Sequence, residues 1–256
     1  MQHRHSNKQK YFEEQITSTR QTILPYIQNF IPLGPKTRVL EVGCGHGGNL
    51  IPFIEKGCNA TGVDLSENWI KLAHKNYKER GLDHTQIILK NIYDFDSKTT
   101  FDFIFLKDVI EHIHDQGQFM SIIKQLLAPN GKIFFAFPPW QMPYGGHQQI
   151  CKGILSKLPW FHLLPMPIYK GILRLFGEKS RIKALSEIKQ TGISIERFEK
   201  ILKKENYNIV QQTHWLINPN YEIKFGLKRR TQLGIIKSIP YLRNYFTTCS
   251  YYLVSL

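Results

Sequence analysis

Short, almost wholly apolar runs alternate with segments of helical periodicity through the first 140 residues of this 256-residue chain. Runs this apolar are typical of strands that are covered on both faces, as in parallel sheets. Parallel strands need long crossover connections, and the helical segments between the runs can supply them. The alternation therefore predicts an α/β fold built on a doubly wound, mostly parallel sheet. The five predicted strands of this core are Thr37–Val42, Ala60–Val63, Gln86–Leu89, Phe101–Leu106 and Lys132–Phe137.

Capping signals mark where the connecting helices begin and end. Ser66 is a good N-cap for the helix that follows the second strand, and Gly81 ends that helix. The turn residues Pro129-Asn130-Gly131 are expected to stop the last of these helices and to lead into the fifth strand. The predicted helices are Asn49–Lys56, Glu67–Arg80 and Gly117–Leu127.

The segments on both sides of this core differ from it. Tyr11–Phe30 has the pattern of an amphipathic helix, whereas residues 141–190 are rich in proline, aromatic residues and lysine and show no clear strand. Helical periodicity returns at Ile193–Asn206, with Ser194 as its N-cap. Two further strands, the second of them antiparallel, are expected to complete a seven-stranded sheet. These strands are Asn208–Leu216 and Cys249–Leu253.

We expect one domain over residues 1–256, because no repeat or low-complexity linker divides the chain. Its expected parts are a helical N-terminal segment (1–35), a ligand-binding core (36–140), a lid inserted after the fifth strand (141–192) and a C-terminal segment that completes the sheet (193–256).

The charge of the chain is unevenly distributed. The formal net charge is +14, and residues 151–256 carry 18 Lys and Arg against 6 Asp and Glu. A basic half of this kind indicates an anionic partner: nucleic acid, a membrane surface or a phosphorylated substrate. A generally basic surface that serves solubility is the alternative interpretation.

Composition points to the cytoplasm. No stretch reaches the length of a transmembrane helix, and the polar N-terminal residues lack the apolar segment of a signal peptide. The four cysteines are dispersed, which favours reduced thiols over a disulfide framework or a zinc site. We therefore expect a cytoplasmic protein, with peripheral membrane contact as an open alternative.

A glycine-rich loop, EVGCGHGGN, stands where the first strand meets the first helix. Its glycines allow a tight turn and a close approach of a ligand to the backbone. Gly43, Gly45 and Gly48 also satisfy the dinucleotide pattern G-x-G-x-x-G, and Asp64 follows at the distance of a ribose-binding carboxylate. Glu41 distinguishes a dinucleotide site from a site for a cationic ligand. Its carboxylate would repel a pyrophosphate but would attract a cation.

Four motifs follow one another in order: VLEVGCGHGGN, GVDLS, FDFIFLKDVIEHI and LLAPNGKIFFAFP. Together, over residues 36–140, they resemble the successive motifs of class I S-adenosylmethionine-dependent methyltransferases. The resemblance implies a Rossmann-like fold, S-adenosylmethionine as cofactor and methyl transfer as the activity. An NAD-dependent oxidoreductase becomes a distant alternative.

The resemblance also implies roles for individual residues of the loop and of the strand ends. Cys44 is expected to be a small apolar filler without reactivity, and many family members have Asp where Asn91 stands. The implied cofactor-binding residues are Glu41, Gly43, Cys44 and Gly45 at the methionine portion, Asp64 at the ribose, Leu65, Asn91 and Ile92 at the adenine, and Lys107 through its backbone beside the methionine.

Candidate catalytic residues follow the fourth and fifth predicted strands. His147, in a loop with two glycines, is the best candidate for a substrate-side base, and His112 and Glu111 are two further candidates. The DVIEH segment that begins at Asp108 also resembles the E-x-x-E-H metal motif of ubiquinone-biosynthesis O-methyltransferases and small-RNA 2′-O-methyltransferases. D-V-x-E-H is also widespread in methyltransferases in which the residues at Glu111 and His112 are structural, so we expect no metal.

The insertion and the basic half bear on the methyl acceptor. Apolar residues that include Trp160 and Phe161 are interleaved with lysines between residues 150 and 176, as in a lid or in a segment that rests on an anionic membrane. We expect a small-molecule or lipid-like acceptor and O-methylation. The alternatives are a nucleic-acid methyltransferase and a non-catalytic cofactor-binding protein.

Overall fold

The computed structural model describes residues 8–84, 86–95, 98 and 100–256. Within these ranges, strands from both halves of the chain form one sheet in the order β3-β2-β1-β4-β5-β8-β6-β7. Strands β1 to β5 are parallel, and β8 lies antiparallel between β5 and β6. The strands are β1 (Arg38–Val42), β2 (Asn59–Asp64), β3 (Ile87–Leu89), β4 (Phe101–Lys107), β5 (Leu127–Phe137), β6 (Asn208–Ile217), β7 (Arg230–Thr231) and β8 (Cys249–Ser255).

The predicted Rossmann-like α/β class is confirmed, but the sheet has eight strands rather than seven. The additional strand, β7, has only two residues and pairs with β6 at the edge of the sheet. A strand of two residues carries no readable alternation, so the sequence pattern could not predict it.

The predicted turn before the fifth strand is wrong, because β5 already begins at Leu127. Phe101 pairs with Leu127, but Phe103 pairs with Lys132, so the intervening residues of β5 form a bulge. Asn130 occupies the left-handed region within this bulge, with φ of 64°. The turn residues therefore lie inside the strand.

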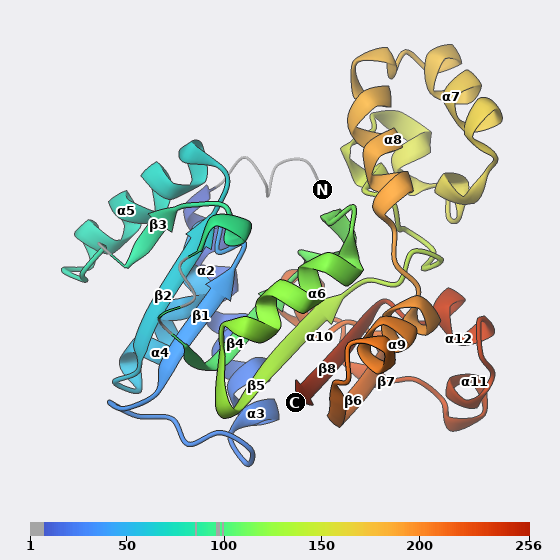
Figure 1. Cartoon of the computed structure of the whole chain (residues 1–256). Helices are drawn as coiled ribbons and strands as arrows, with labels where there is room; N and C mark the ends of the chain where they lie inside the picture. The colour runs from blue at the N-terminus through green and yellow to red at the C-terminus, as the bar shows by residue number, and fades with distance from the viewer. Residues whose placement is uncertain (1–7, 85, 96–97, 99) are drawn as a thin grey trace.

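Both faces of the sheet are buried under helices (Figure 1). Phe103 and Phe105 point from β4 into one apolar cluster, and the alternate residues Ile104 and Leu106 point into the other. This explains the uninterrupted apolar runs, since neither face of the strand meets water. The covering helices are α4 (Ile51–Glu55) and α5 (Glu67–Glu79) with the N-terminal segment on the first face, and α6 (Gln116–Gln125) and α9 (Ile195–Lys204) on the second.

Two of the predicted helix starts are confirmed by their capping bonds. The Ser66 side chain accepts a hydrogen bond from the Trp69 backbone at 3.4 Å, and Ser194 accepts one from Arg197 at 3.1 Å. Short helices α10 (Pro219–Phe225), α11 (Gly234–Ser238) and α12 (Leu242–Tyr245) connect the last strands.

The predicted N-terminal helix Tyr11–Phe30 is interrupted. It consists of α2 (Lys8–Ser18), a π-helical turn η1 (Thr19–Ile23) and α3 (Leu24–Ile27). Pro25 has no N–H to donate to the Gln21 carbonyl, and that carbonyl instead accepts a bond from the Arg229 guanidinium at 3.2 Å. The proline thus accounts for the break. The polar residues 1–7 lie outside the described residues.

The regular elements of the inserted segment after β5 are all helical (Figure 1). The segment also has a small hydrophobic core of its own. In the picture it projects beyond the carboxyl end of β5. Its elements are the 3₁₀ turns η5 (Gln148–Ile150), η6 (Gly153–Lys157), η7 (Phe161–Leu163) and η8 (Lys179–Arg181) and the helices α7 (Met166–Leu175) and α8 (Ile182–Thr191). Its core consists of Cys151, Leu155, Phe161, Tyr169, Leu173 and Leu185.

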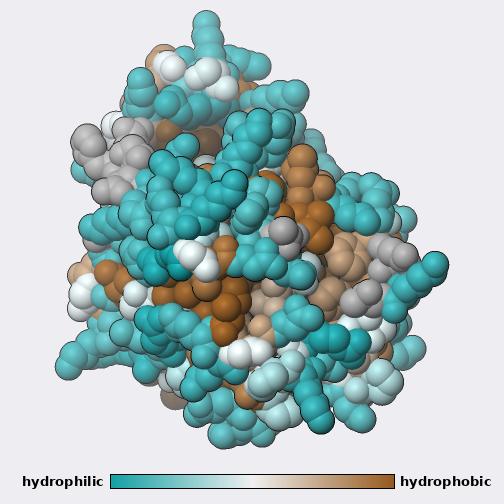
Figure 2. All heavy atoms as spheres, turned by 90° about the vertical axis from the view of Figure 1, so that its left-hand side faces the viewer, coloured by the Kyte–Doolittle hydropathy of each residue, from teal (hydrophilic) through white to brown (hydrophobic). Residues whose placement is uncertain are grey.

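The side view in Figure 2 shows apolar side chains among hydrophilic ones in the middle of the molecule, below a predominantly hydrophilic upper part. Among the described residues, no helix combines the length and the apolar character that a membrane crossing requires.

Candidate active site

The glycine-rich loop is bound to the second strand and needs its glycines. The backbone N–H groups of Gly43 and Cys44 donate to the Val63 carbonyl at 2.8 and 3.0 Å. Gly43 has φ of 73°, and a Cβ there would lie 2.5 Å from a Val109 methyl group. Gly45 has φ of 52°, and a Cβ there would meet nothing within 4 Å. The loop is therefore tightly packed at Gly43 and faces open space at Gly45.

Asp64 lies at the carboxyl end of β2, beside this loop. Its carboxylate accepts backbone hydrogen bonds from Gly45 and Ser66, each at 2.8 Å. These bonds hold the carboxylate at the mouth of the loop while leaving lone pairs for a ligand. The next residue, Leu65, is 72% exposed although it is apolar. An exposed apolar side chain beside a fixed carboxylate suits the ring and the hydroxyl groups of a nucleoside.

Glu41 is buried behind the loop, with only 1% of its surface exposed. Oε1 accepts a hydrogen bond from the Asn49 side chain at 2.7 Å, whereas Oε2 has no partner among the described residues. Burial raises the pKa of Glu41 to about 8, despite the Asn49 bond and the nearby Lys107 ammonium. A buried carboxyl group with one oxygen that accepts no hydrogen bond from the described residues suits a cationic ligand. Burial disfavours the ionised carboxylate, and a bound cation would stabilise it.

The remaining predicted cofactor residues lie at the ends of β3 and β4. The Asn91 side chain accepts a bond from the Tyr93 backbone at 3.2 Å and begins the turn η3 (Ile92–Asp94), in which Ile92 is buried. The Lys107 ammonium donates to Ser18 in α2 at 2.9 Å, and burial lowers its pKa. Its side chain thus connects β4 to the N-terminal helix.

Glu111, His112 and His147 lie together, although 35 residues separate the last two in the chain. The rings of His112 and His147 meet edge to face with centroids 4.9 Å apart. One side-chain N or O atom from each of the three residues lies within 4.8 Å of the others. The loops after β4 and β5 thus bring all three predicted catalytic residues to one place at the carboxyl edge of the sheet.

The three side chains differ in their electrostatic surroundings. Glu111 is buried, and neither of its carboxylate oxygens has a hydrogen-bond partner among the described residues. Burial and the neighbouring Asp108 charge hold the pKa of Glu111 well above its usual range. His112 is exposed, yet desolvation of its ring lowers its pKa against the opposing effect of Asp108. His112 is therefore a neutral imidazole near pH 7, able to accept a proton.

Sequence reasoning missed three polar side chains at this site. Asn49 ends the glycine-rich motif, but its role as the hydrogen-bond donor to Glu41 appears only in the structure. The phenols of Tyr11, from α2, and Tyr221, from α10, both have raised pKa values, caused first by burial and then by charges that include Asp108. Tyr11 lies in a predicted helix and Tyr221 in a segment without a predicted element, and neither position indicated that α2 and α10 approach the site.

Three comparisons place these features among known proteins. The model of a methyltransferase domain family matches residues 9–212. A ubiquinone biosynthesis O-methyltransferase of Idiomarina loihiensis is 34% identical over 101 residues, which are 39% of this chain and 41% of the relative. A protein of the same name from Histophilus somni is 31% identical over 151 residues, which are 54% of this chain and 61% of the relative.

Among solved structures, a S-adenosylmethionine-dependent methyltransferase from Clostridium acetobutylicum has a TM-score of 0.56 at 14% identity, and the match covers 96% of this chain and 92% of the other. The likeness is one of fold. The sheet, the loop motifs and the family match together define a class I S-adenosylmethionine-dependent methyltransferase, with S-adenosylmethionine as its cofactor. The chain belongs to the methyltransferase domain family. It spans only 41% and 61% of the length of the two curated relatives.

Proposed function

We propose that this protein transfers the methyl group of S-adenosylmethionine to a hydroxyl oxygen of a small-molecule or lipid-like acceptor. The observation that carries the proposal is the pair of histidines, His112 and His147, beside the buried Glu111 at the carboxyl edge of the sheet. Oxygen nucleophiles benefit from a base, and the curated relatives are named as O-methyltransferases of ubiquinone biosynthesis.

The loop and strand ends are proposed to hold the cofactor. Glu41 would pair with the ammonium group of its methionine portion, in contact with the backbone of Gly43, Cys44 and Gly45. Asp64 would accept the ribose hydroxyls, since its carboxylate is already fixed at the mouth of the loop. The remaining proposed contacts are Leu65, Asn91 and Ile92 at the adenine and the backbone of Lys107 at the methionine.

The protein's own contribution to the reaction is alignment and proton transfer. Bound S-adenosylmethionine would supply an electrophilic methyl group. Holding the acceptor oxygen in line with that group can contribute about 7–11 kcal/mol in favourable cases. His147 would accept the hydroxyl proton, with His112 orienting its ring through their edge-to-face contact. Burial of Glu111 raises the pKa of its carboxyl group, which disfavours a negative charge beside the developing oxyanion.

The insertion is proposed to cover the acceptor as a lid. Leu175 and Ile154 are exposed apolar side chains on it, and a lipid-like acceptor or an anionic membrane surface would contact such groups. Trp160 is partly exposed and donates a bond to the Gln141 carbonyl at 3.1 Å. Phe161 is buried in the core of the insertion, so in the membrane alternative the exposed Trp160, and not Phe161, would supply the contact.

A product screen tests the proposed function. The protein is incubated with methyl-labelled S-adenosylmethionine and separate panels of phenols, carboxylic acids, amines and short RNAs, and labelled products are identified by mass spectrometry. Labelled methyl ethers of phenols are expected. Transfer to nitrogen or to RNA alone would contradict the proposal, and absence of transfer to every panel would favour a non-catalytic cofactor-binding protein.

Adding a chelator to the assay distinguishes a base role for His147 from metal binding by the same three residues. Glu111, His112 and His147 could hold a divalent cation, since their ligand atoms are close enough. If His147 is a base, turnover should be unchanged by EDTA. Loss of turnover that Mg²⁺ or Zn²⁺ restores would assign the cluster to a metal instead.

Replacing Asp64 should weaken cofactor binding more than it weakens the fold. Asp64→Ala removes a charged acceptor from the ribose, and such hydrogen bonds contribute about 1.5–3 kcal/mol, so we expect the Kd for S-adenosylhomocysteine to rise roughly ten- to hundredfold. Asp64→Asn keeps one acceptor oxygen and should lose less. Thermal unfolding without ligand controls for the lost bonds to Gly45 and Ser66. An unchanged Kd in Asp64→Ala would show that Asp64 does not contact the ribose.

A further inference from the structure

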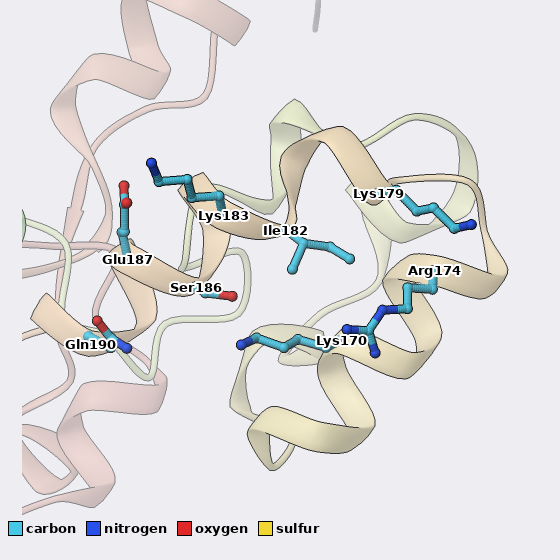
Figure 3. A pocket seen from close by; sticks show the side chains of 8 residues that line it. All are labelled: Lys170, Arg174, Lys179, Ile182, Lys183, Ser186, Glu187 and Gln190. Atoms are coloured by element: carbon cyan, nitrogen blue, oxygen red, sulfur yellow. The ribbon is translucent and has the colours of Figure 1, made fainter.

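An open groove of about 610 Å³ lies within the insertion, between α7 and α8 (Figure 3). None of the proposed cofactor-binding or catalytic residues lines it. It is lined by Lys170, Arg174, Lys179, Ile182, Lys183, Ser186, Glu187 and Gln190.

The groove carries a positive charge that the surrounding protein does not neutralise. Four of its lining residues are cationic and one, Glu187, is acidic, and no ion pair joins any of them to another described residue. The buried acid nearest in sequence, Glu178, is already bonded to the Arg181 guanidinium and to the Lys152 backbone. Lys170 and Arg174 stand four residues apart on α7, where like charges repel one another at a cost of a few tenths of a kcal/mol.

A buried hydroxyl group points to a ligand independently of the charge. Ser186 is only 8% exposed, lines the groove, and its Oγ has no hydrogen-bond partner among the described residues. In Figure 3 the Ser186 side chain is directed into the space between the two helices, and Lys170 and Arg174 extend from α7 toward that space. A buried hydroxyl without a partner costs free energy, which a bound acceptor group would recover.

We propose that this groove binds a phosphate group. A phosphate offers several strong acceptor oxygens, which match the forked donors of Arg174, the ammonium of Lys170 and the hydroxyl of Ser186. Its charge would remove the repulsion between the cations. The volume leaves room for an organic part attached to the phosphate. A nucleic acid would need a row of such contacts, whereas in Figure 3 Lys170 and Arg174 are the two labelled cations that extend toward this hollow. The inference does not depend on the proposed methyl acceptor.

Binding is measured by calorimetry at low ionic strength, with glycerol 3-phosphate as the soluble probe. Co-sedimentation with phosphatidylcholine vesicles, with and without phosphatidic acid, tests a lipid headgroup. We expect saturable binding that Arg174→Glu weakens roughly ten- to hundredfold, because a charge-assisted bidentate contact is lost. Lys157→Glu is the matched control, since it makes the same charge change at an exposed position of the insertion outside the groove. It should change the Kd less than about twofold. Ser186→Ala should weaken binding severalfold without adding charge.

The calorimetric and the vesicle measurements together identify the source of the phosphate. Binding of glycerol 3-phosphate that depends on Arg174 assigns a free phosphorylated compound. Binding to phosphatidic acid vesicles alone, with the same dependence on Arg174, assigns a lipid headgroup. The proposal is overturned if neither probe binds saturably, or if Arg174→Glu and Lys157→Glu lose binding equally. Turnover of the methyl acceptor is not part of this measurement, so its outcome is separate from that of the product screen.

Discussion

Replacing His147 with asparagine is expected to lower kcat roughly 10²- to 10⁴-fold, which is the usual contribution of a positioned base. His147 has φ of 53°, in the left-handed region, and asparagine tolerates this region better than alanine. The variant should therefore keep the loop while removing the imidazole. Steady-state kinetics with the acceptor found in the product screen measure the effect, and the Kd for S-adenosylhomocysteine should stay unchanged.

His114→Ala is the control for this prediction. His114 is an exposed histidine in the same loop as His112, two residues further along the chain. Its loss should leave kcat within about twofold. If His147→Asn turned over as fast as the unaltered protein, His147 would not be the base, and the proton would have to leave by another route.

Cofactor affinity is expected to rise with pH up to about 8, because of Glu41. Its pKa lies at about 8 in the ligand-free protein, well above the usual 4.5 of an unfolded chain, so the carboxyl group is largely protonated at neutral pH. Pairing with the ammonium group of the cofactor favours the ionised form, and binding below pH 8 therefore releases a proton. The Kd should fall by up to about tenfold per pH unit below this value and level off above it.

The same pKa shift makes a prediction for stability. Between the unfolded pKa of 4.5 and the folded pKa of about 8, the folded state holds a proton that the unfolded chain has lost. Ligand-free protein should therefore lose stability as pH rises through this window, by at most about 1.4 kcal/mol per pH unit from this group.

Calorimetric titration with S-adenosylhomocysteine in buffers of different ionisation enthalpy counts the released protons. Glu41→Gln should bind more weakly, with neither proton release nor the pH dependence. An affinity that is constant from about pH 6 to about pH 8, without proton release, would show that Glu41 does not pair with the cofactor's charge.

The core of the fold could be predicted because both faces of its strands are buried. β4 shows why: its successive residues enter two different apolar clusters, which produces an unbroken apolar run. Where the observed fold differs from the predicted one, the causes are local and cannot be read from the hydrophobic pattern. Pro25 interrupts the N-terminal helix, Asn130 lies in a bulge within β5, and β7 is too short to show alternation.

For the candidate site, sequence motifs marked the residues but not their partners. Glu41 was predicted from its place before the loop, whereas the hydrogen bond from Asn49 and the free oxygen appear only in the structure. His112 and His147 were two separate candidates, and their contact depends on how the loops after β4 and β5 approach each other. Such long-range contacts leave no periodic signal in a single sequence.

The glycine-rich loop is expected to bind S-adenosylmethionine rather than a dinucleotide. Differential scanning fluorimetry with S-adenosylhomocysteine and with NAD, each at matched concentrations, tests it most directly. A ligand at about 100 times its Kd stabilises the folded state by about 2.7 kcal/mol. We therefore expect S-adenosylhomocysteine to raise the Tm by several degrees and NAD to leave it unchanged. A rise with NAD and none with S-adenosylhomocysteine would show that the loop binds a dinucleotide instead.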